Sequence, residues 1–185
     1  MSGPGTSQDP ATEDLEKLME GYQQAEAGAA ALLVERLSPQ VFHYFLGQVR
    51  DRSVAEDLLQ DFWLRVHKAR QTYRSGEPVL PWIFAIARRA RIDDYRRRSR
   101  VARHEFQSDS LPEASVEQTA GDSPHQIEDM LKTLPAGQRE TLLLLKVAGL
   151  SLEEVARATG TSVGAVKQKA HRAYETLRTQ FRSPS

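Results

Sequence analysis

The sequence of 185 residues contains no cysteine. This absence excludes structural disulfides, zinc sites with thiolate ligands and cysteine nucleophiles, and it permits a reducing compartment. Long apolar runs are also missing. No stretch approaches the roughly 20 residues that span a bilayer, and the start of the chain lacks the apolar core of a signal peptide. We therefore expect a cytoplasmic protein without membrane insertion.

Catalytic and metal-binding patterns are absent from the sequence as well. The five histidines lie at positions 43, 67, 104, 125 and 171, without metal-ligand spacing, and there is no glycine-rich phosphate loop or nucleophile motif. Isolated histidines of this kind are more often core or surface residues. We therefore predict no enzyme activity, no catalytic residue, no metal and no cofactor.

Strand patterns are nearly absent, whereas the helical periodicity of apolar residues continues almost everywhere after Glu13. A chain of 185 residues is long enough for one domain or two small ones, and its 39% of hydrophobic residues supports packed cores. The predicted fold class is all-α. In the first half we expect four helices. The first covers residues 15–33 and loosens at Gly28, and the second starts at Val41 after Ser38-Pro39. The third is capped by Ser53 and Glu56 and ends before Tyr73, and the fourth opens at Trp82.

The net charge is zero, but the charges alternate in blocks along the chain. Residues 63–103 carry 12 basic and 3 acidic side chains, and residues 131–185 carry 9 and 4. Each basic block follows an acidic one, which is typical of a protein that presents basic surface to DNA at two places. Charge runs also occur on ordinary solvated faces, so this pattern supports DNA binding without establishing it.

Residues 104–123 are mainly Ser, Glu, Asp, Pro, Gly and Thr without Lys or Arg, which predicts a flexible acidic linker joining two small helical domains. The predicted organisation is a disordered N-terminus over residues 1–12, a first domain over 13–100, a linker over 101–125 and a second domain over 126–182. In the second domain we expect a helix from about Gln126, a leucine-rich helix over residues 137–147 and a helix-turn-helix.

The helix-turn-helix prediction rests on local signals. Ser151 and Glu154 form a capping box, so a helix should begin at Leu152 and end at Gly160, which can adopt the left-handed conformation. Ser162 can cap the next helix, whose apolar stripe is Val163, Val166, Ala170, Ala173, Leu177 and Phe181. The opposite face carries Gly164, Lys167, Gln168, His171, Arg172 and Glu175, whose donors suit phosphates and the major groove. An ordinary antiparallel helix pair with a solvated basic face is the alternative.

Four motifs precede the helix-turn-helix in one order: Glu56–Asp61 (EDLLQD), Trp82–Arg88 (WIFAIAR), Ile92–Asp93 and Leu134–Glu140 (LPAGQRE). In this order and spacing, with the acidic linker between them, the chain resembles a bacterial RNA polymerase sigma factor of the extracytoplasmic-function group in the sigma-70 family. The resemblance covers roughly residues 13–100 and 126–180. It implies an alternative sigma factor that binds core RNA polymerase and promoter DNA, and whose activity is commonly held in check by an anti-sigma factor.

The resemblance also implies roles for individual residues. In such factors the helix with the Asp-Leu-x-Gln pattern docks on a coiled coil of the largest polymerase subunit, here through Asp57, Gln60 and Asp61. Taken alone, these residues fit the solvent face of any bundle helix.

Promoter contacts are implied at two places. The loop over residues 73–81 and the helix from Trp82 correspond to the part that melts and reads the promoter element near position −10. The residues implied there are Trp82, Phe84, Arg88, Arg89, Arg96 and Arg97, the last two in a cluster that would hold backbone phosphates. Trp82 is equally suited to be a core anchor. The residues that align with contacts to the element near position −35 are Ser162, Lys167, Gln168, Lys169, His171 and Arg172.

One other function fits part of the sequence. A transcription regulator with a response-regulator-type helix-turn-helix shares the Leu134-Pro135 and Gly149-Leu150-Ser151 features, and it would act without replacing sigma. Such a protein would usually carry an α/β receiver or a ligand-binding domain ahead of its DNA-binding part. Residues 13–100 have no strand pattern, which disfavours this alternative.

Overall fold

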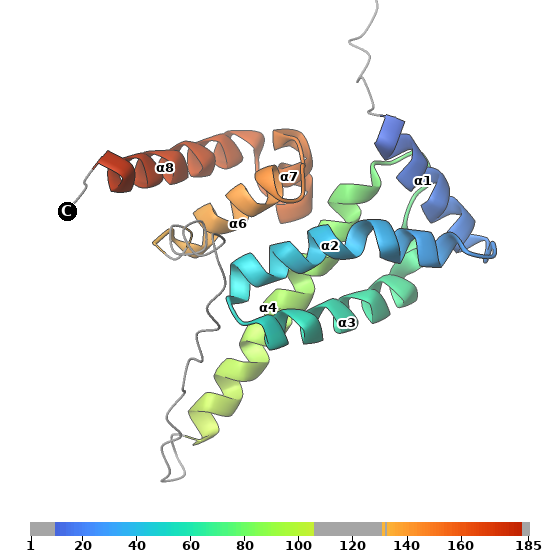
Figure 1. Ribbon diagram of the computed structural model, residues 1–185, viewed down its shortest axis with the longest axis horizontal. Coiled ribbons are helices and arrows are strands. Elements are labelled where there is room, and N and C mark those ends of the chain that lie inside the picture. Colours follow the sequence, from blue (N-terminus) through green and yellow to red (C-terminus); the bar gives the residue numbers. More distant parts are fainter. Residues whose placement is uncertain (1–9, 106–130, 132, 183–185) are drawn as a thin grey trace, which may run out of the picture.

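The computed structural model describes residues 10–105, 131 and 133–182, and each regular element in these ranges is a helix (Figure 1). The first group comprises α1 (Pro10–Gln23), α2 (Ala29–Val49), α3 (Arg52–Ala69), the short 3-10 helix η1 (Arg70–Thr72) and α4 (Val79–Glu105). The second group comprises α6 (Ala136–Lys146), α7 (Leu152–Thr159) and α8 (Val163–Arg182). The all-α prediction is confirmed. Among the described residues, none of the helices has the length and hydropathy that crossing a bilayer requires.

Aromatic rings form the centre of the first group. Tyr44 and Phe45 of α2, Phe62 of α3 and Phe84 of α4 have no exposed area. The ring centroids of Tyr44 and Phe84 lie 5.5 Å apart and those of Phe45 and Phe62 lie 6.2 Å apart, both edge to face. Such pairs contribute about 0.5–1.5 kcal/mol beyond the area they bury. This core fixes α4, which carries the arginine-rich segment, against α2 and α3.

The helix α2 runs through Pro39, where the sequence predicted a break between two helices. An interior proline removes a backbone hydrogen bond and costs about 3 kcal/mol. Leu37 and Val41, on either side of it, are both buried, and burying one such side chain stabilises by about 1.5–3 kcal/mol, which offsets the cost. The break occurs instead at Gly28, whose φ of 86° favours glycine. The helix predicted over residues 15–33 is therefore divided between α1 and α2.

The start of α3 also differs from the prediction. Asp51, not Ser53, is the N-cap, because its Oδ1 accepts a hydrogen bond of 3.0 Å from the amide of Val54. Ser53 lies inside the first turn, and the amide of Ala55 that follows it already donates to the carbonyl of Asp51 at 2.9 Å, so a serine at this position has no free amide to cap. The predicted end is confirmed, since α3 and η1 both finish before Tyr73.

The helix α4 begins at Val79, earlier than the predicted start at Trp82, and extends to Glu105. Pro81 is tolerated because a proline in the first turn has no helical hydrogen bond to lose. Residues 101–105, predicted as linker, are therefore helical. The rest of the predicted linker and nearly all of the helix predicted from about Gln126 lie outside the described residues.

The helix-turn-helix prediction is confirmed in its local details. Ser151 Oγ accepts from the amide of Glu154 at 3.2 Å, and Glu154 Oε2 accepts from the amide of Ser151 at 2.8 Å, which completes the capping box. Gly160 ends α7 with a φ of 65°. Ser162 Oγ then accepts from the amide of Ala165 at 3.2 Å at the start of α8.

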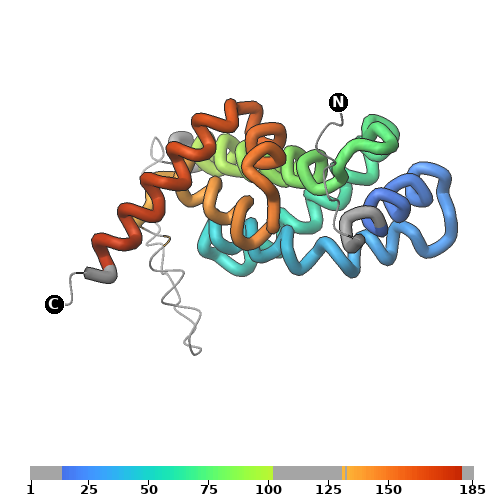
Figure 2. The backbone as a smooth tube through the Cα atoms, turned by 90° about the horizontal axis from the view of Figure 1, so that it is seen from above, coloured from blue at the N-terminus to red at the C-terminus, as the bar shows by residue number. Residues whose placement is uncertain are grey.

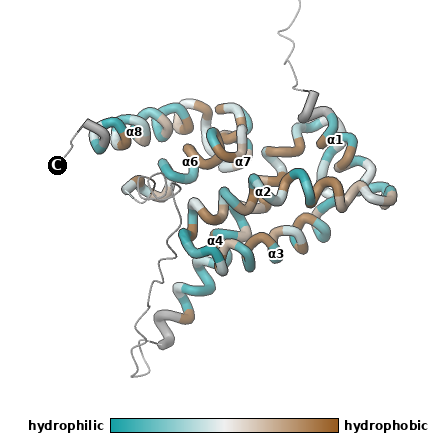
Figure 3. Tube along the Cα trace, viewed as in Figure 1, coloured by the Kyte–Doolittle hydropathy of each residue, from teal (hydrophilic) through white to brown (hydrophobic). Residues whose placement is uncertain are grey.

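The two groups of helices pack against each other. Figures 1 and 2 show α6 and α7 beside α2 and α4, and these helices make contacts with one another. Leu143 and Leu144 of α6 and Val155 of α7 belong to the same apolar cluster as the core of the first group. Figure 3 shows hydrophilic residues along much of α8 and of the second half of α4. The second group therefore covers the first half of α4 and leaves its arginine-rich second half open.

Candidate functional site

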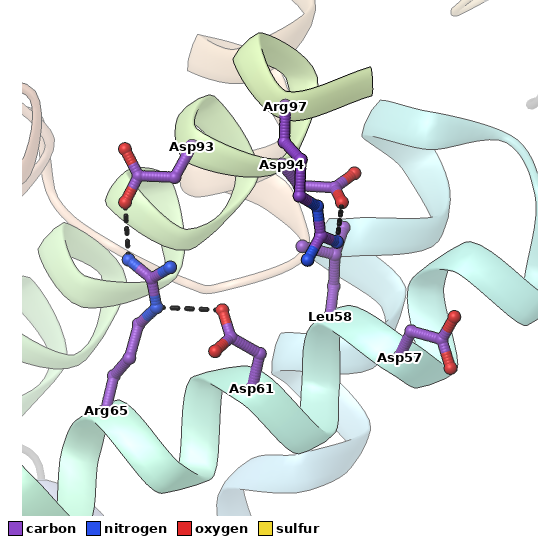
Figure 4. A pocket seen from close by; sticks show the side chains of 7 residues that line it. All are labelled: Asp57, Leu58, Asp61, Arg65, Asp93, Asp94 and Arg97. Atoms are coloured by element: carbon purple, nitrogen blue, oxygen red, sulfur yellow. Dashed lines mark hydrogen bonds and ion pairs between the residues drawn. The ribbon is translucent and has the colours of Figure 1, made fainter. Parts of the chain in front are cut away.

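An ion-pair network joins α3 to α4 (Figure 4). Arg65 of α3 donates from Nε to Asp61 Oδ2 at 2.8 Å and from Nη1 to Asp93 Oδ2 of α4 at 2.6 Å. The hydrogen bond to Asp93 is the largest cause of the raised pKa of Arg65. The pairs flank an open pocket of about 370 Å³ that is lined by Asp57, Leu58, Asp61, Arg65, Asp93, Asp94 and Arg97. This network holds α3 and α4 in a fixed orientation relative to each other, and therefore fixes the relative position of their outer faces.

The residues predicted to contact polymerase lie on one face of α3. Asp57 and Gln60 are exposed, and Asp61 is half-buried. Asp61 is engaged by Arg65, whereas Asp57 has no ion-pair partner among the described residues. Leu64 exposes 61% of its area on the same face. Leu64 was not predicted from the sequence. It follows Gln60 by four residues and Asp61 by three, and this spacing would have placed it on the same helix face.

The loop between η1 and α4 is anchored by Tyr73. The buried phenol donates a hydrogen bond to the carbonyl of Glu77, and its ring meets Trp82 edge to face with centroids 5.6 Å apart. Burial, followed by the nearby charges of Glu16 and Glu20 and that of Glu77, raises the pKa of Tyr73 to about 12. Trp82 is half-buried, so it anchors this loop and still reaches solvent.

The other residues predicted at the −10 element differ in their accessibility. Phe84 has no exposed area and packs against Tyr44, so its ring cannot reach a base while the core is intact. Arg89 and Arg96 are exposed. Arg97 is exposed too, and its Nη2 donates to Oδ1 of the buried Asp94 at 2.6 Å. The surface of α4 that DNA could contact therefore does not include Phe84.

Arg88 lies against the second group of helices. Its Nε is 3.2 Å from Oε1 of Glu140 on α6, a carboxylate whose side chain is only 10% exposed. Arg91 Nη2 donates to the same oxygen at 3.2 Å, and the hydroxyl of Tyr44 donates to it at 3.3 Å. Burial, followed by the charge of Glu140, raises the pKa of Tyr44, which keeps the phenol protonated as a donor. This role of Glu140 was not predicted from the sequence.

An exposed aromatic residue lies among the arginines of α4. Tyr95 exposes 69% of its area, and Arg98 beside it is bound to Asp94 at 2.7 Å. Tyr95 falls at helical spacing from two arginines before it and one after it, so all four share one face. We call this face the α4 stripe; it consists of Arg88, Arg91, Tyr95 and Arg98. Tyr95 was not predicted from the sequence, because the aromatic residues considered there were those at the start of this helix.

The predicted DNA-reading face of α8 is open to solvent. Lys167, Gln168, His171 and Arg172 are exposed. Ser162 is exposed, but its hydroxyl accepts the capping hydrogen bond. Lys169 is half-buried, since its side chain reaches toward Gly137 of α6. Val166, Ala170 and Ala173 form the buried stripe that holds this helix in place. Among the described residues, no cluster of acidic or histidine side chains could hold a metal ion.

Comparisons with known proteins match both groups of helices. The family model for sigma-70 region 2 matches residues 33–101, and the model for sigma-70 region 4 matches residues 125–177. The RNA polymerase sigma factor CarQ of Myxococcus xanthus is 34% identical over 162 residues, which cover 86% of this chain and 93% of that one. The ECF RNA polymerase sigma factor SigD of Mycobacterium tuberculosis is 34% identical over 161 residues, covering 80% of this chain and 75% of that one.

Two solved structures have the same fold. The sigma factor RpoE from Bartonella quintana, solved in complex with the anti-sigma factor NepR, superposes with a TM-score of 0.71 at 22% identity and covers 86% of this chain and 100% of that one. CnrH, solved in complex with the cytosolic domain of CnrY, superposes with a TM-score of 0.68 at 24% identity and covers 95% of this chain and 99% of that one.

Proposed function

We infer the function from one premise: the chain belongs to the extracytoplasmic-function (ECF) group of the sigma-70 family of RNA polymerase sigma factors. It is an alternative sigma factor, which binds core RNA polymerase and directs it to specific promoters. The observation that carries this conclusion is the match of region 2 and region 4, in this order, on a chain that aligns with sigma factors over most of its length. The catalysis of RNA synthesis belongs to the polymerase, so this protein acts by binding, in the cytoplasm where the polymerase works.

The outer face of α3 is the proposed polymerase contact. Asp57 and Gln60 are accessible there, and Leu64 adds exposed apolar area. Interfaces of this kind combine an apolar centre with charged groups that orient the partner. The Arg65 pairs to Asp61 and Asp93 would keep this face rigid while it docks.

The −10 element is the proposed ligand of α4 and the loop before it. The accessible residues with suitable chemistry are Trp82, Arg89, Arg96 and Arg97. An aromatic side chain can stack with an unpaired base for about 1–3 kcal/mol, and arginines neutralise the backbone, which makes binding sensitive to salt. Arg88 joins this set only if Glu140 releases it.

The −35 element is the proposed ligand of α8, through Lys167, Gln168, His171 and Arg172, with Ser162 and Lys169 at the edge of the contact. The first residues of a recognition helix enter the major groove, where Lys and Gln side chains can bind base edges. The small residues Gly164 and Ala165 near the start of α8 leave room for this approach.

An anti-sigma factor is the proposed inhibitory partner. The RpoE neighbour was solved in complex with the anti-sigma factor NepR, and CnrH was solved in complex with the cytosolic domain of CnrY. For this chain the partner would be a protein that binds region 2 and region 4 together, since both surfaces lie in one compact arrangement (Figure 1).

Transcription from defined templates tests the function. Purified protein is added to sigma-free core polymerase on a library of promoter fragments, and run-off transcripts are sequenced. We expect initiation on a subset of fragments that share two short elements, and no initiation from core alone. A protein that binds duplex DNA tightly by itself but never supports initiation would instead be a helix-turn-helix regulator.

A further inference from the structure

The last residue of α1 binds the main chain that leads into the loop before α4. Gln23 Nε2 donates to the carbonyl of Arg70 at 2.7 Å and to the carbonyl of Tyr73 at 2.9 Å. In the opposite direction, Gln71 Nε2 donates to the carbonyl of Gln23 at 3.0 Å. A glutamine amide has two N–H donors, and the two hydrogen bonds from Nε2 use both of them. Gln23 therefore bridges the two ends of η1, at the point where the loop begins.

A second contact joins α1 to the middle of the loop. Ser75 Oγ donates to Oε1 of Glu20, which lies one turn before Gln23 on α1. Figure 1 shows α1 beside this part of the chain, and α1 contacts both η1 and α4. Arg74, Ser75 and Glu77 are exposed, whereas Gln23 is half-buried. The helix α1 thus supports the inner side of the loop and leaves its outer side chains accessible to a ligand.

The effect of Gln23 extends to Trp82 through Tyr73. The ring of Tyr73 meets Trp82 edge to face with centroids 5.6 Å apart, and its hydroxyl donates to the carbonyl of Glu77. Tyr73 is only 4% exposed, so its ring cannot move independently of its backbone. A shift of the carbonyl that Gln23 binds would therefore displace the loop and the indole together. Recognition sites tolerate a displacement of only about 0.5 Å.

We propose that Gln23 is a positioning residue for promoter recognition: it binds the main chain on both sides of η1 and thereby places the loop and Trp82 against the −10 element. Gln23 itself contacts no base, because both donors of its amide are used within the protein. The family match to region 2 begins at residue 33, so α1 lies ahead of the matched segment. This proposal rests on the proposed role of the loop and of Trp82 in binding the −10 element.

The test compares Gln23→Met with Gln24→Met in the full chain. Methionine has nearly the length of glutamine but no N–H donor, so the first variant removes the two hydrogen bonds with little change in shape. Gln24 is exposed and follows Gln23 directly, which makes it a matched control. Gln23→Lys places donors at the same position and serves as the rescue variant. Met19 of α1 is fully buried in the core, so α1 should stay docked in each variant, and circular dichroism verifies the fold.

Hydrogen exchange measures the loop in the free protein. The amides of Tyr73 and Glu77 donate to the carbonyls of Arg70 and Arg74, so their exchange rates report on the loop backbone. We expect Gln23→Met to raise both rates about tenfold, the effect of one or two lost hydrogen bonds. Gln24→Met should leave both rates unchanged, and Gln23→Lys should restore slow exchange at least in part.

Transcription measures promoter recognition. Each variant is added to sigma-free core polymerase with templates that carry all four bases at each position of the −10 element and a constant −35 element. We expect Gln23→Met to lower the preference for the best base over the others about tenfold, because a displaced loop and ring no longer fit one base better than the rest. Its affinity for core polymerase should stay as in the natural protein. Gln24→Met should retain the base preference, and Gln23→Lys should recover part of it.

The outcomes separate the positioning role from simple stabilisation. Faster exchange together with a lost base preference, both reversed by lysine, supports the proposal. If Gln23→Met exchanges as slowly as Gln24→Met, Gln23 does not hold the loop and the proposal is wrong. If exchange is faster but transcription falls equally for every −10 base, Gln23 only stabilises the fold, and the positioning role is wrong. If the natural protein never supports initiation, the proposed function fails and promoter positioning fails with it, whereas exchange still shows whether Gln23 holds the loop.

Discussion

Leu143 of α6 packs directly on the backbone of Gly47 in α2. A Cβ atom at position 47 would lie 2.7 Å from Cδ2 of Leu143, closer than real side chains approach each other. Gly47 therefore allows the leucine-rich helix of region 4 to approach region 2, and the pair lies at the same interface as Glu140. This close approach makes the two positions suitable for a covalent lock.

A disulfide between positions 47 and 143 should hold the protein closed. In the double variant Gly47→Cys and Leu143→Cys, the smaller side chain at 143 makes room for the new one at 47, and no other thiol competes. We expect the oxidised protein to lose most of its run-off transcription with core polymerase and to regain it after addition of a reductant. The reduced double variant is the control, and full activity of the oxidised form would show that the regions need not separate.

A substitution on the face of α3 should weaken polymerase binding. Asp57 is exposed and has no ion-pair partner among the described residues, so Asp57→Ala removes a charge without breaking an internal contact. We expect about a tenfold loss of affinity for core polymerase, which is typical for a central interface residue. The neighbouring Glu56→Ala is the control, because Glu56 pairs with Arg52 at 2.9 Å and points along a different side of the helix. Titration of labelled polymerase measures both, and equal effects would contradict the proposed contact face.

The DNA-reading face of α8 should be separable from polymerase binding. Replacing Lys167 and Arg172 with Ala should abolish transcription that depends on the −35 element and leave the affinity for core polymerase unchanged. If each residue holds one phosphate, the salt dependence of promoter binding should fall by about one unit of slope for each. Arg178→Ala is the control, since Arg178 is exposed on α8 but pairs with Glu175 at 2.8 Å. A loss of polymerase binding in the double variant would contradict this assignment of surfaces.

The parts of the fold that depend on neighbouring residues could be predicted from the sequence. The capping box of Ser151 and Glu154 and the left-handed Gly160 act within one or two turns, and the structure contains both. Pro39 was misjudged because its effect depends on how well the flanking leucine and valine pack against distant helices. Local propensity is only a weak guide where tertiary packing is strong.

The contact between the regions could not be predicted, for a related reason. Nothing in the leucine-rich helix indicates that Glu140 meets Arg91, because this pairing depends on how two separate domains meet. The burial of Phe84, by contrast, could have been predicted from the sequence. Ile83 directly precedes it and Ala87 follows one turn later, and both are buried, so a wider apolar face on α4 would have indicated that Phe84 is buried. The sequence prediction placed it at the promoter because an aromatic ring can stack on an unpaired base, and the resemblance assigns this segment to the −10 element.

Sequence and structure disagree on which residue caps the N-terminus of α3, and substitutions at the two candidate positions test this point. Asp51 Oδ1 accepts the hydrogen bond from Val54, whereas Ser53 lies in the first turn of the helix. Asp51→Ala should therefore lower the free energy of unfolding by about 1 kcal/mol, the usual cost of losing a cap. Ser53→Ala should be neutral or stabilise by a few tenths of a kcal/mol, because alanine has the higher helix propensity. Urea unfolding followed by circular dichroism measures both variants, and a larger loss for Ser53→Ala would restore the capping box that the sequence predicted.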